Sequence, residues 1–198
     1  MSKPLYLFVG RSASGKTTVA NILAEQHGYK QVESFTTRPP RFDNEPGHVF
    51  VTEDEFNNLG ELAAYTFYNG NHYGTTFKQL DECSIYVVDV PGVESLLYKY
   101  QNKDRKICII YFDASVHTRI ERMIDRGDCD TAIVCRLLQD EKDDWLSNLR
   151  ATVWPYNNVI RNHINILIIN ANMDLNDVLD QVLYYIKKQE ESNSDYCM

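Results

Sequence analysis

The sequence predicts an α/β protein in which helices cover both faces of a mainly parallel β-sheet. Short apolar segments alternate along the chain with segments of helical pattern, and glycine or proline separates several of them. Strands that alternate with helices favour parallel pairing through helical crossovers. Apolar residues make up 43% of the 198 residues and charged residues 24%, which is typical of one globular domain with a full core.

The strands are predicted from short apolar runs, because strands buried on both faces lack the polar alternation of exposed ones. In chain order the predicted strands span residues 4–10, 30–37, 84–90, 106–114 and 164–170. The fourth, KICIIYFDA, is the most apolar of them. Residues 38–48 hold three prolines and a glycine, so we expect a loop there.

The helices are predicted from their periodic apolar positions and their start and stop signals. They span residues 16–28, 52–59, 92–102, 115–127, 130–149 and 174–188. Gly28 and Gly127 stop the helices that they follow, and Thr52 is an N-cap before an acidic first turn. We find no repeat and no linker that would divide the chain.

The segment GRSASGKT, residues 10–17, matches a phosphate-binding loop and lies between a predicted strand and a predicted helix. Its glycines let the backbone approach phosphate oxygens, while N–H groups and the helix N-terminus supply positive potential. We expect Lys16 to reach the β- and γ-phosphates and the hydroxyl of Thr17 to ligate Mg²⁺. The motif comprises Gly10, Arg11, Ser12, Ala13, Ser14, Gly15, Lys16 and Thr17.

A second cationic site is needed opposite the phosphate loop if the chain transfers phosphate to a small acceptor. Arg38 and Arg41, in the segment SFTTRPPR, are the first candidates, because guanidinium groups bind phosphate bidentately. The alternative is a pair of surface arginines.

A third cationic group predicts a lid. Arg122 and Arg126 lie four residues apart on one helix face, and Arg136 belongs to the next predicted helix. Closure of such a lid brings arginines to the oxygens of a transferring phosphoryl group. Arg119, on the same helix, is expected to be a surface charge.

Taken together, these residues resemble the guanylate kinase family of nucleoside monophosphate kinases. The resemblance covers nearly the whole chain through GRSASGKTT, SFTTRPPR, FVTEDEF, GNHYGTT, VVDVPGVESL, RIERMIDRG, CRLL and LIIN. It implies a P-loop NTPase-like fold with a core over 1–33, 80–125 and 160–190. It also implies a lobe for the nucleoside monophosphate over 34–79 and a helical lid over 126–136.

The same resemblance implies ATP-dependent phosphoryl transfer to a purine nucleoside monophosphate, with GMP or dGMP as the leading acceptor and Mg²⁺ as cofactor. Lys16, Arg38, Arg126 and Arg136 would be catalytic. ATP would bind on residues 10–18, which include Thr18, and Asn170 would lie near its adenine. The residues implied to hold the acceptor are Ser34, Arg38, Arg41, Glu45, His48, Phe67, Tyr73, Thr75 and Asp89.

Three acceptor positions leave alternatives open. Phe67 stands where we count the family's glutamate, which accepts hydrogen bonds from guanine, and a phenyl ring cannot accept them. An unpaired polar group in a closed pocket costs about 1–3 kcal/mol, so another purine or a modified nucleotide is a possible acceptor. His48 replaces a phosphate-binding tyrosine, and either donates to phosphate, best when protonated, or is an exposed loop residue. Asp89 recognises guanine or caps a helix.

Composition narrows the partners and the location. The net charge of −8 argues against a broad nucleic-acid surface. No stretch approaches the ~20 apolar residues of a transmembrane helix. The scattered cysteines predict reduced thiols in a cytoplasmic protein, and they are Cys83, Cys108, Cys129, Cys135 and Cys197. Either a monomer or a homodimer is possible.

Two other functions compete with a nucleotide kinase. A non-catalytic binding module related to guanylate kinases is disfavoured by the intact Lys16 and Thr17. A kinase for ribose bisphosphate is disfavoured by Asp89, because a sugar acceptor has no base to recognise.

Overall fold

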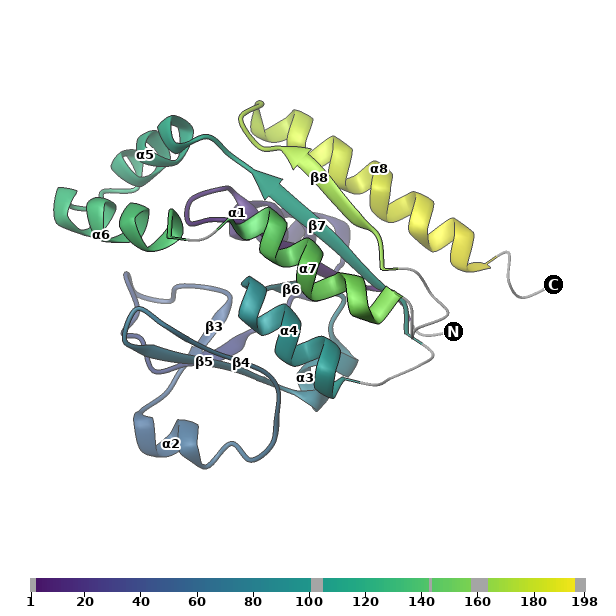
Figure 1. Cartoon of the computed structure of the whole chain (residues 1–198), viewed down its shortest axis with the longest axis horizontal. Coiled ribbons are helices and arrows are strands. Elements are labelled where there is room, and N and C mark those ends of the chain that lie inside the picture. Colours follow the sequence, from purple (N-terminus) through teal and green to yellow (C-terminus); the bar gives the residue numbers. More distant parts are fainter. Residues whose placement is uncertain (1–2, 101–104, 143, 158–163, 195–198) are drawn as a thin grey trace.

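The computed structural model describes residues 3–100, 105–142, 144–157 and 164–194 (Figure 1). Cys197 and the end of the predicted helix at 101–102 lie outside these ranges. Cysteines 83, 108, 129 and 135 are free thiols. Within the same ranges, no helix has the length and apolar character needed to cross a bilayer.

The central sheet is entirely parallel and confirms the predicted fold class. Its strand order is β6-β1-β7-β8. In chain order these strands are β1 (Leu5–Val9), β6 (Ile85–Val87), β7 (Ile107–Asp113) and β8 (Ile166–Asn170). β1 pairs with both β6 and β7, so the most buried strand carries the phosphate loop at its carboxyl end. Ligands of open α/β sheets bind at this edge.

Both faces of the central sheet are covered, because alternate residues of β1 point to opposite sides. Leu5 and Leu7 pack in one buried cluster with residues of α4 (Val90–Lys99) and α7 (Trp145–Asn157). Tyr6 and Phe8 pack in a second cluster on the other face. That cluster includes residues of α1 (Lys16–His27) and α8 (Leu175–Ser194) (Figure 1).

A second sheet, below the first in Figure 1, has the order β3-β2-β5-β4. Its strands are β2 (Ser34–Thr36), β3 (His48–Phe50), β4 (Leu62–Tyr68) and β5 (Asn71–Thr76), with α2 (Glu53–Asn57) and α3 (Phe77–Glu82) beside them. β3, β4, β5 and α3 were not predicted, and β3 begins at His48, the last residue of the predicted loop. An Asn-Gly turn joins β4 to β5, with φ of 49° at Asn69 and 76° at Gly70. This is the dipeptide that two-residue hairpins favour.

The single helix predicted over 130–149 is wrong. The chain forms α6 (Asp130–Asp140), which follows α5 (Val116–Asp125), and then starts α7 separately. Asp144 begins the new helix, because its carboxylate accepts bonds from the Ser147 N–H at 3.2 Å and the Ser147 hydroxyl at 2.7 Å. The end of α6 lies at the phosphate loop, where the Asp140 carboxylate accepts from the Ser12 N–H.

Candidate active site

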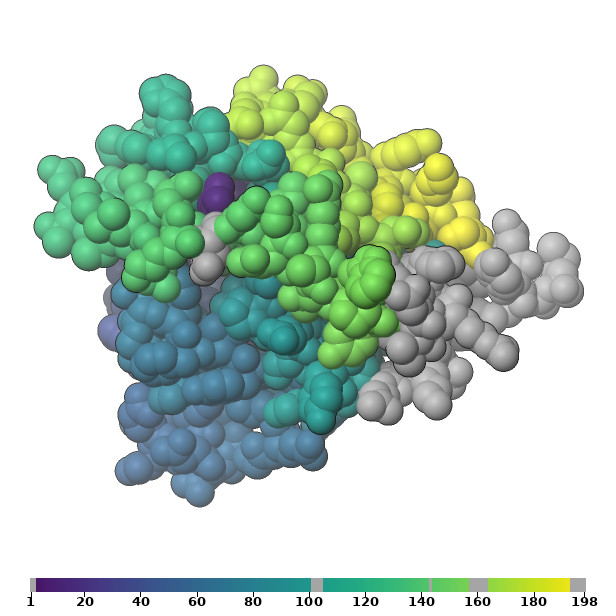
Figure 2. Space-filling model, viewed as in Figure 1, coloured from purple at the N-terminus to yellow at the C-terminus, as the bar shows by residue number. Residues whose placement is uncertain are grey.

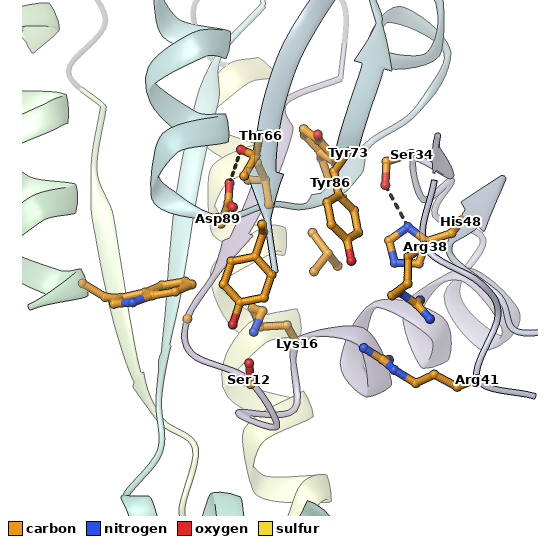
Figure 3. Close-up of a pocket in the computed structure, with 15 residues that line it drawn as sticks. Ser12, Lys16, Ser34, Arg38, Arg41, His48, Thr66, Tyr73, Tyr86 and Asp89 are labelled. Carbon is orange, nitrogen blue, oxygen red and sulfur yellow. Dashed lines mark hydrogen bonds between the residues drawn. The ribbon is translucent and has the colours of Figure 1, made fainter. Parts of the chain in front are cut away.

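A pocket opens between the two sheets and brings the phosphate loop opposite the predicted acceptor residues. Figure 3 shows Ser12 and Lys16 at one end, Arg38 and Arg41 at another, and Asp89 with Thr66 across from the arginines. In Figure 2 a small purple area, from the first residues of the chain, reaches the surface between the green segments of α6 and α7.

The phosphate loop joins β1 to α1 with the backbone that its glycines allow. Gly10 has φ 151° and Gly15 has φ 96°. A Cβ at Gly10 would lie 2.5 Å from the carbonyl oxygen of Phe112, so only glycine fits there without a shift. Gly15 precedes the first residue of α1, where helix N–H groups lack partners within the helix. The predicted phosphate cradle is thus present as backbone geometry.

Lys16 folds back over this loop. Its Nζ donates to the carbonyl oxygen of Arg11 at 2.7 Å and to Oγ of Ser14 at 3.2 Å. Burial lowers the pKa of Lys16 to about 8, although the nearby Asp140 carboxylate opposes the shift. A cation held at this point can neutralise phosphate charge.

Thr17 and Thr18 follow on the exposed first turn of α1. A hydroxyl next to the phosphate cradle is an oxygen ligand of the kind that Mg²⁺ takes together with substrate phosphates, so Thr17 fits the predicted metal role. Asn170 ends β8, and its Oδ1 accepts from the N–H of Asn172 at 3.1 Å. The roles of Thr17, Thr18 and Asn170 stay predictions.

Four predicted acceptor residues line the opposite wall of the pocket, and they are Ser34, Arg38, Arg41 and Tyr73. His48 joins them from β3, with its Nδ1 2.9 Å from Oγ of Ser34. Burial and the charge of Arg38 lower the pKa of His48 to about 4, so the imidazole is neutral at pH 7. His48 is therefore not an exposed loop residue, and any hydrogen bond that it makes near pH 7 comes from a neutral ring.

Glu45 lies behind the arginines rather than in the wall of the pocket. It accepts from Nη1 and Nη2 of Arg38 at 3.1 and 2.9 Å, and from the backbone N–H and Nη1 of Arg41 at 2.8 and 3.1 Å. Burial opposes ionisation, but these donors outweigh it and lower the pKa of Glu45. Glu45 thus positions the two arginines, and its own contact with an acceptor stays a prediction.

Of the two alternatives that the sequence left open for Asp89, the helix cap is present, and the recognition of guanine stays a prediction. Asp89 lines the pocket and also caps α4, because its Oδ1 accepts from the Gly92 N–H at 2.9 Å. The same oxygen accepts from Oγ1 of Thr66 at 2.7 Å. Burial raises the pKa of Asp89 despite these bonds. Thr75 is fully buried beneath this part of the pocket, where Tyr86 forms the wall.

The structure does not place Phe67 in the pocket. Phe67 pairs with His72 across the hairpin, its ring centroid lies 4.9 Å from that of His72, and its side chain is 59% exposed. Successive residues of a strand point to opposite faces, so Thr66 and Tyr68 line the pocket instead. Counting back from a motif selected the wrong face of the strand.

The predicted lid arginines share one carboxylate. Arg126 donates to Asp128 from Nε at 3.2 Å, and Nη1 of Arg136 also contacts the Asp128 carboxylate. Neither arginine lines the pocket in this arrangement, so their contact with phosphate stays a prediction. Arg122 instead donates to the carbonyl oxygen of Ala171 at 2.7 Å.

Arg119 is not a surface charge. It is fully buried, and its Nη1 lies 2.9 Å from Oδ2 of Asp140, which is also fully buried. Asp140 was not predicted, because no motif gives a signal for it. Thr66, Tyr68, Tyr86 and Trp145 were not predicted as pocket residues either, although strand alternation in the hairpin would have indicated the first two.

The chain is similar to known guanylate kinases. No protein-family model matches it. It is 31% identical to the guanylate kinase of Lactobacillus johnsonii over 157 residues, which cover 70% of this chain and 74% of that relative. It is also 31% identical to the guanylate kinase of Geobacter metallireducens over 109 residues, which cover 49% of this chain and about half, 54%, of that relative.

Solved structures agree on the fold. The crystal structure of guanylate kinase from Anaplasma phagocytophilum has a TM-score of 0.58 and 19% identity, and the match covers 96% of this chain and 87% of that one. A gluconokinase from Sinorhizobium meliloti has a TM-score of 0.54 and 14% identity over 100% of this chain and 99% of that one. At these identities the likeness confirms the predicted P-loop NTPase-like fold alone.

Proposed function

This chain belongs to the guanylate kinase family of nucleoside monophosphate kinases, and we propose that it transfers the γ-phosphoryl group of ATP to GMP or dGMP. The observation that carries the proposal is a single pocket lined by Lys16, by Arg38 with Arg41, and by Asp89. Lys16 suits the donor phosphates, the two arginines suit the acceptor phosphate, and Asp89 suits the acceptor base. The cytoplasmic location and the oligomeric state stay predictions.

The acceptor phosphate would bind between the arginines and the hydroxyls of Ser34 and Tyr73. Guanidinium groups suit a phosphate because they donate two parallel hydrogen bonds. Glu45 holds the guanidinium groups of Arg38 and Arg41, so little side-chain freedom remains to be lost on binding. An acceptor held this way presents a phosphate oxygen for in-line attack.

The γ-phosphoryl group would pass from ATP on the phosphate loop to this oxygen. No covalent enzyme intermediate is needed, because positioning and charge stabilisation supply the catalysis. Lys16 would neutralise charge on the donor phosphates. Arg126 and Arg136 would exchange Asp128 for phosphate oxygens as the lid closes, which also excludes water. Mg²⁺, held by Thr17, would add positive charge at the phosphates.

Asp89 and Thr66 would recognise the acceptor base. A carboxylate accepts from the N–H groups of a guanine edge, and a hydroxyl can donate or accept. Oδ1 of Asp89 is already engaged by Thr66 and Gly92, which leaves Oδ2 for the ligand. A single carboxylate on this wall is the reason to test other purines alongside GMP.

ADP release from ATP and Mg²⁺ tests the proposal with a panel of acceptors: GMP, dGMP, AMP, IMP, the pyrimidine monophosphates and ribose bisphosphate. We expect turnover with GMP or dGMP at least tenfold above the others. Lys16→Met is the control and should lose transfer while it keeps its fold by circular dichroism. Preference for another acceptor would change the assigned substrate, and a full panel without turnover would favour a binding module.

A further inference from the structure

The buried ion pair between Arg119 and Asp140 is not explained by the chemistry assigned so far. Neither residue lines the pocket, yet both are fully buried. Burying a charged pair costs desolvation energy that its attraction often fails to recover, so stability alone is a weak reason for it. Nη2 of Arg119 also contacts Oε1 of Glu141 at 2.6 Å, which fixes the end of α6.

Asp140 accepts hydrogen bonds from three separate parts of the fold. Its Oδ2 accepts from the backbone N–H of Ser12 at 2.8 Å, and its Oδ1 from the Ser12 hydroxyl at 3.3 Å. Oδ1 also accepts from the hydroxyl of Tyr68 at 3.1 Å. Together with Arg119 of α5, these donors join the phosphate loop, the second sheet and the lid helices at one carboxylate.

Two of these donors lie in the wall of the pocket. Ser12 belongs to the loop that would hold ATP, and Tyr68 belongs to the sheet that carries Ser34 and Tyr73. A ligand that displaces Tyr68 must therefore act on the carboxylate that also holds Ser12. Burial and the Asp140 charge raise the pKa of Tyr68 to about 12, so its hydroxyl stays protonated and can donate at neutral pH.

We propose that Asp140 is a positioning residue that couples acceptor binding to the geometry of the phosphate loop. This inference rests on the proposed function, because it needs a donor site and an acceptor site on the same chain. Arg119 keeps the carboxylate in place. Tyr68 links it to the acceptor site, and Ser12 links it to the donor site. Coupling is reciprocal, so each nucleotide should tighten the other by the same factor.

Calorimetric titration measures this coupling without turnover. The affinity for a non-hydrolysable ATP analogue is measured with and without saturating GMP, and the affinity for GMP with and without the analogue. In the wild-type protein we expect each to bind at least 5-fold tighter when the other is present, within the usual range of about 5-fold to 150-fold. Asp140→Asn and Tyr68→Phe should both reduce the factor to about 1.

Matched variants distinguish a specific loss of coupling between the two nucleotide sites from a general loss of structure. Tyr98→Phe removes a tyrosine hydroxyl that is 72% exposed on α4 and should keep the wild-type factor. The double variant Tyr68→Phe/Asp140→Asn should lose no more coupling than either single change, because each interrupts the same link from Tyr68 through Asp140 to Ser12. If Asp140→Asn fails to fold, Tyr68→Phe decides the matter.

The outcomes distinguish this inference from the proposed function. Binding of both nucleotides with full coupling in Tyr68→Phe would overturn the role of Asp140 and leave the kinase proposal intact. Binding of both without coupling in the wild type would do the same. Failure of the wild-type protein to bind either nucleotide would overturn both.

Discussion

In β4, a shift of one residue along the strand determines whether a side chain faces the pocket. Thr66 and Phe67 are neighbours, but only Thr66 lines the pocket and donates to Asp89. The glutamate expected at Phe67 would therefore lie on the face of His72. On the proposed function, we therefore expect base recognition to depend on Thr66 and Asp89 more than on Phe67.

Replacing Thr66 by valine should weaken base discrimination. The change keeps the shape of the side chain but removes the hydroxyl that donates to Oδ1 of Asp89. Loss of one such bond to a carboxylate is worth about 1.5–3 kcal/mol, so we expect the ratio of kcat/KM for GMP over AMP to fall about tenfold or more. Phe67→Glu, one residue away on the opposite face, should leave the ratio unchanged. A changed ratio in Phe67→Glu together with an unchanged ratio in Thr66→Val would instead place the acceptor base beside Phe67.

Lys16 should impose an alkaline limit on activity. Its pKa of about 8 means that the positive charge is present below pH 8 and lost as the pH rises through that value. The pH dependence of kcat/KM reports groups of the free enzyme, so this parameter for ATP should fall by up to tenfold per pH unit above pH 8. Phosphate groups titrate near pH 6 and do not interfere. A profile that stays flat to pH 10 would contradict the lowered pKa.

At the scale of elements, the loop between β2 and β3 holds Arg38 and Arg41 against Glu45, and on the proposed function this arrangement would be a preformed phosphate clamp. The prolines of the loop were visible in the sequence, but the arrangement depends on the buried Glu45 that both arginines contact. The pKa of Glu45 is below its ordinary value, so its ion pairs stabilise the fold at neutral pH. That stability is lost only as the pH falls through the lowered pKa.

Replacing Glu45 by glutamine should loosen the clamp. The amide keeps the size of the side chain but removes the charge that orients Arg38 and Arg41. We expect the KM for the acceptor to rise about tenfold, close to 1.4 kcal/mol, while the KM for ATP changes little. Glu53→Gln, on the exposed helix α2, is the matched control. Equal increases in both KM values would indicate general destabilisation rather than a loosened clamp.

The parallel core was predictable from sequence because each of its strands is an apolar run between helical patterns. The hairpin of β4 and β5 was missed because its alternation of polar and aromatic residues is weak, although the Asn-Gly turn signalled it. The prediction of one long helix over 130–149 was wrong because periodicity does not show that the helix ends at Asp140, whose carboxylate is buried.

The site residues, like the elements of the fold, were predictable only where a local sequence pattern indicated them. Residues in local motifs, such as Lys16, Arg38 and Arg41, were predicted and lie at the pocket. Residues whose role depends on distant partners were not. Asp140 meets Ser12 across 128 positions of sequence, and Arg119 differs from an exposed arginine only through Asp140 and Glu141. Single-sequence patterns carry no signal for such pairs.

At the scale of the molecule, the pocket lies between the two sheets, and the α5–α6 pair reaches the phosphate loop through the contact of Asp140 with Ser12. A ligand that contacts the phosphate loop and the second sheet together should hold the two sheets against one another. Ligands that bind only the native state stabilise it by about 2.7 kcal/mol at a concentration 100 times the Kd. For a chain of this size that corresponds to a rise in Tm of about 5–10 °C.

Thermal unfolding therefore tests the assembled site without an assay of chemistry. GMP and a non-hydrolysable ATP analogue should each raise the Tm by about 5–10 °C at 100 times their Kd, and AMP at the same concentration as GMP should raise it less. Lys16→Met should lose most of the shift with the analogue but keep the shift with GMP, because Lys16 contacts the phosphate loop and not the clamp of Arg38 and Arg41. A shift with the analogue alone would mean that the second sheet does not form an acceptor site for GMP.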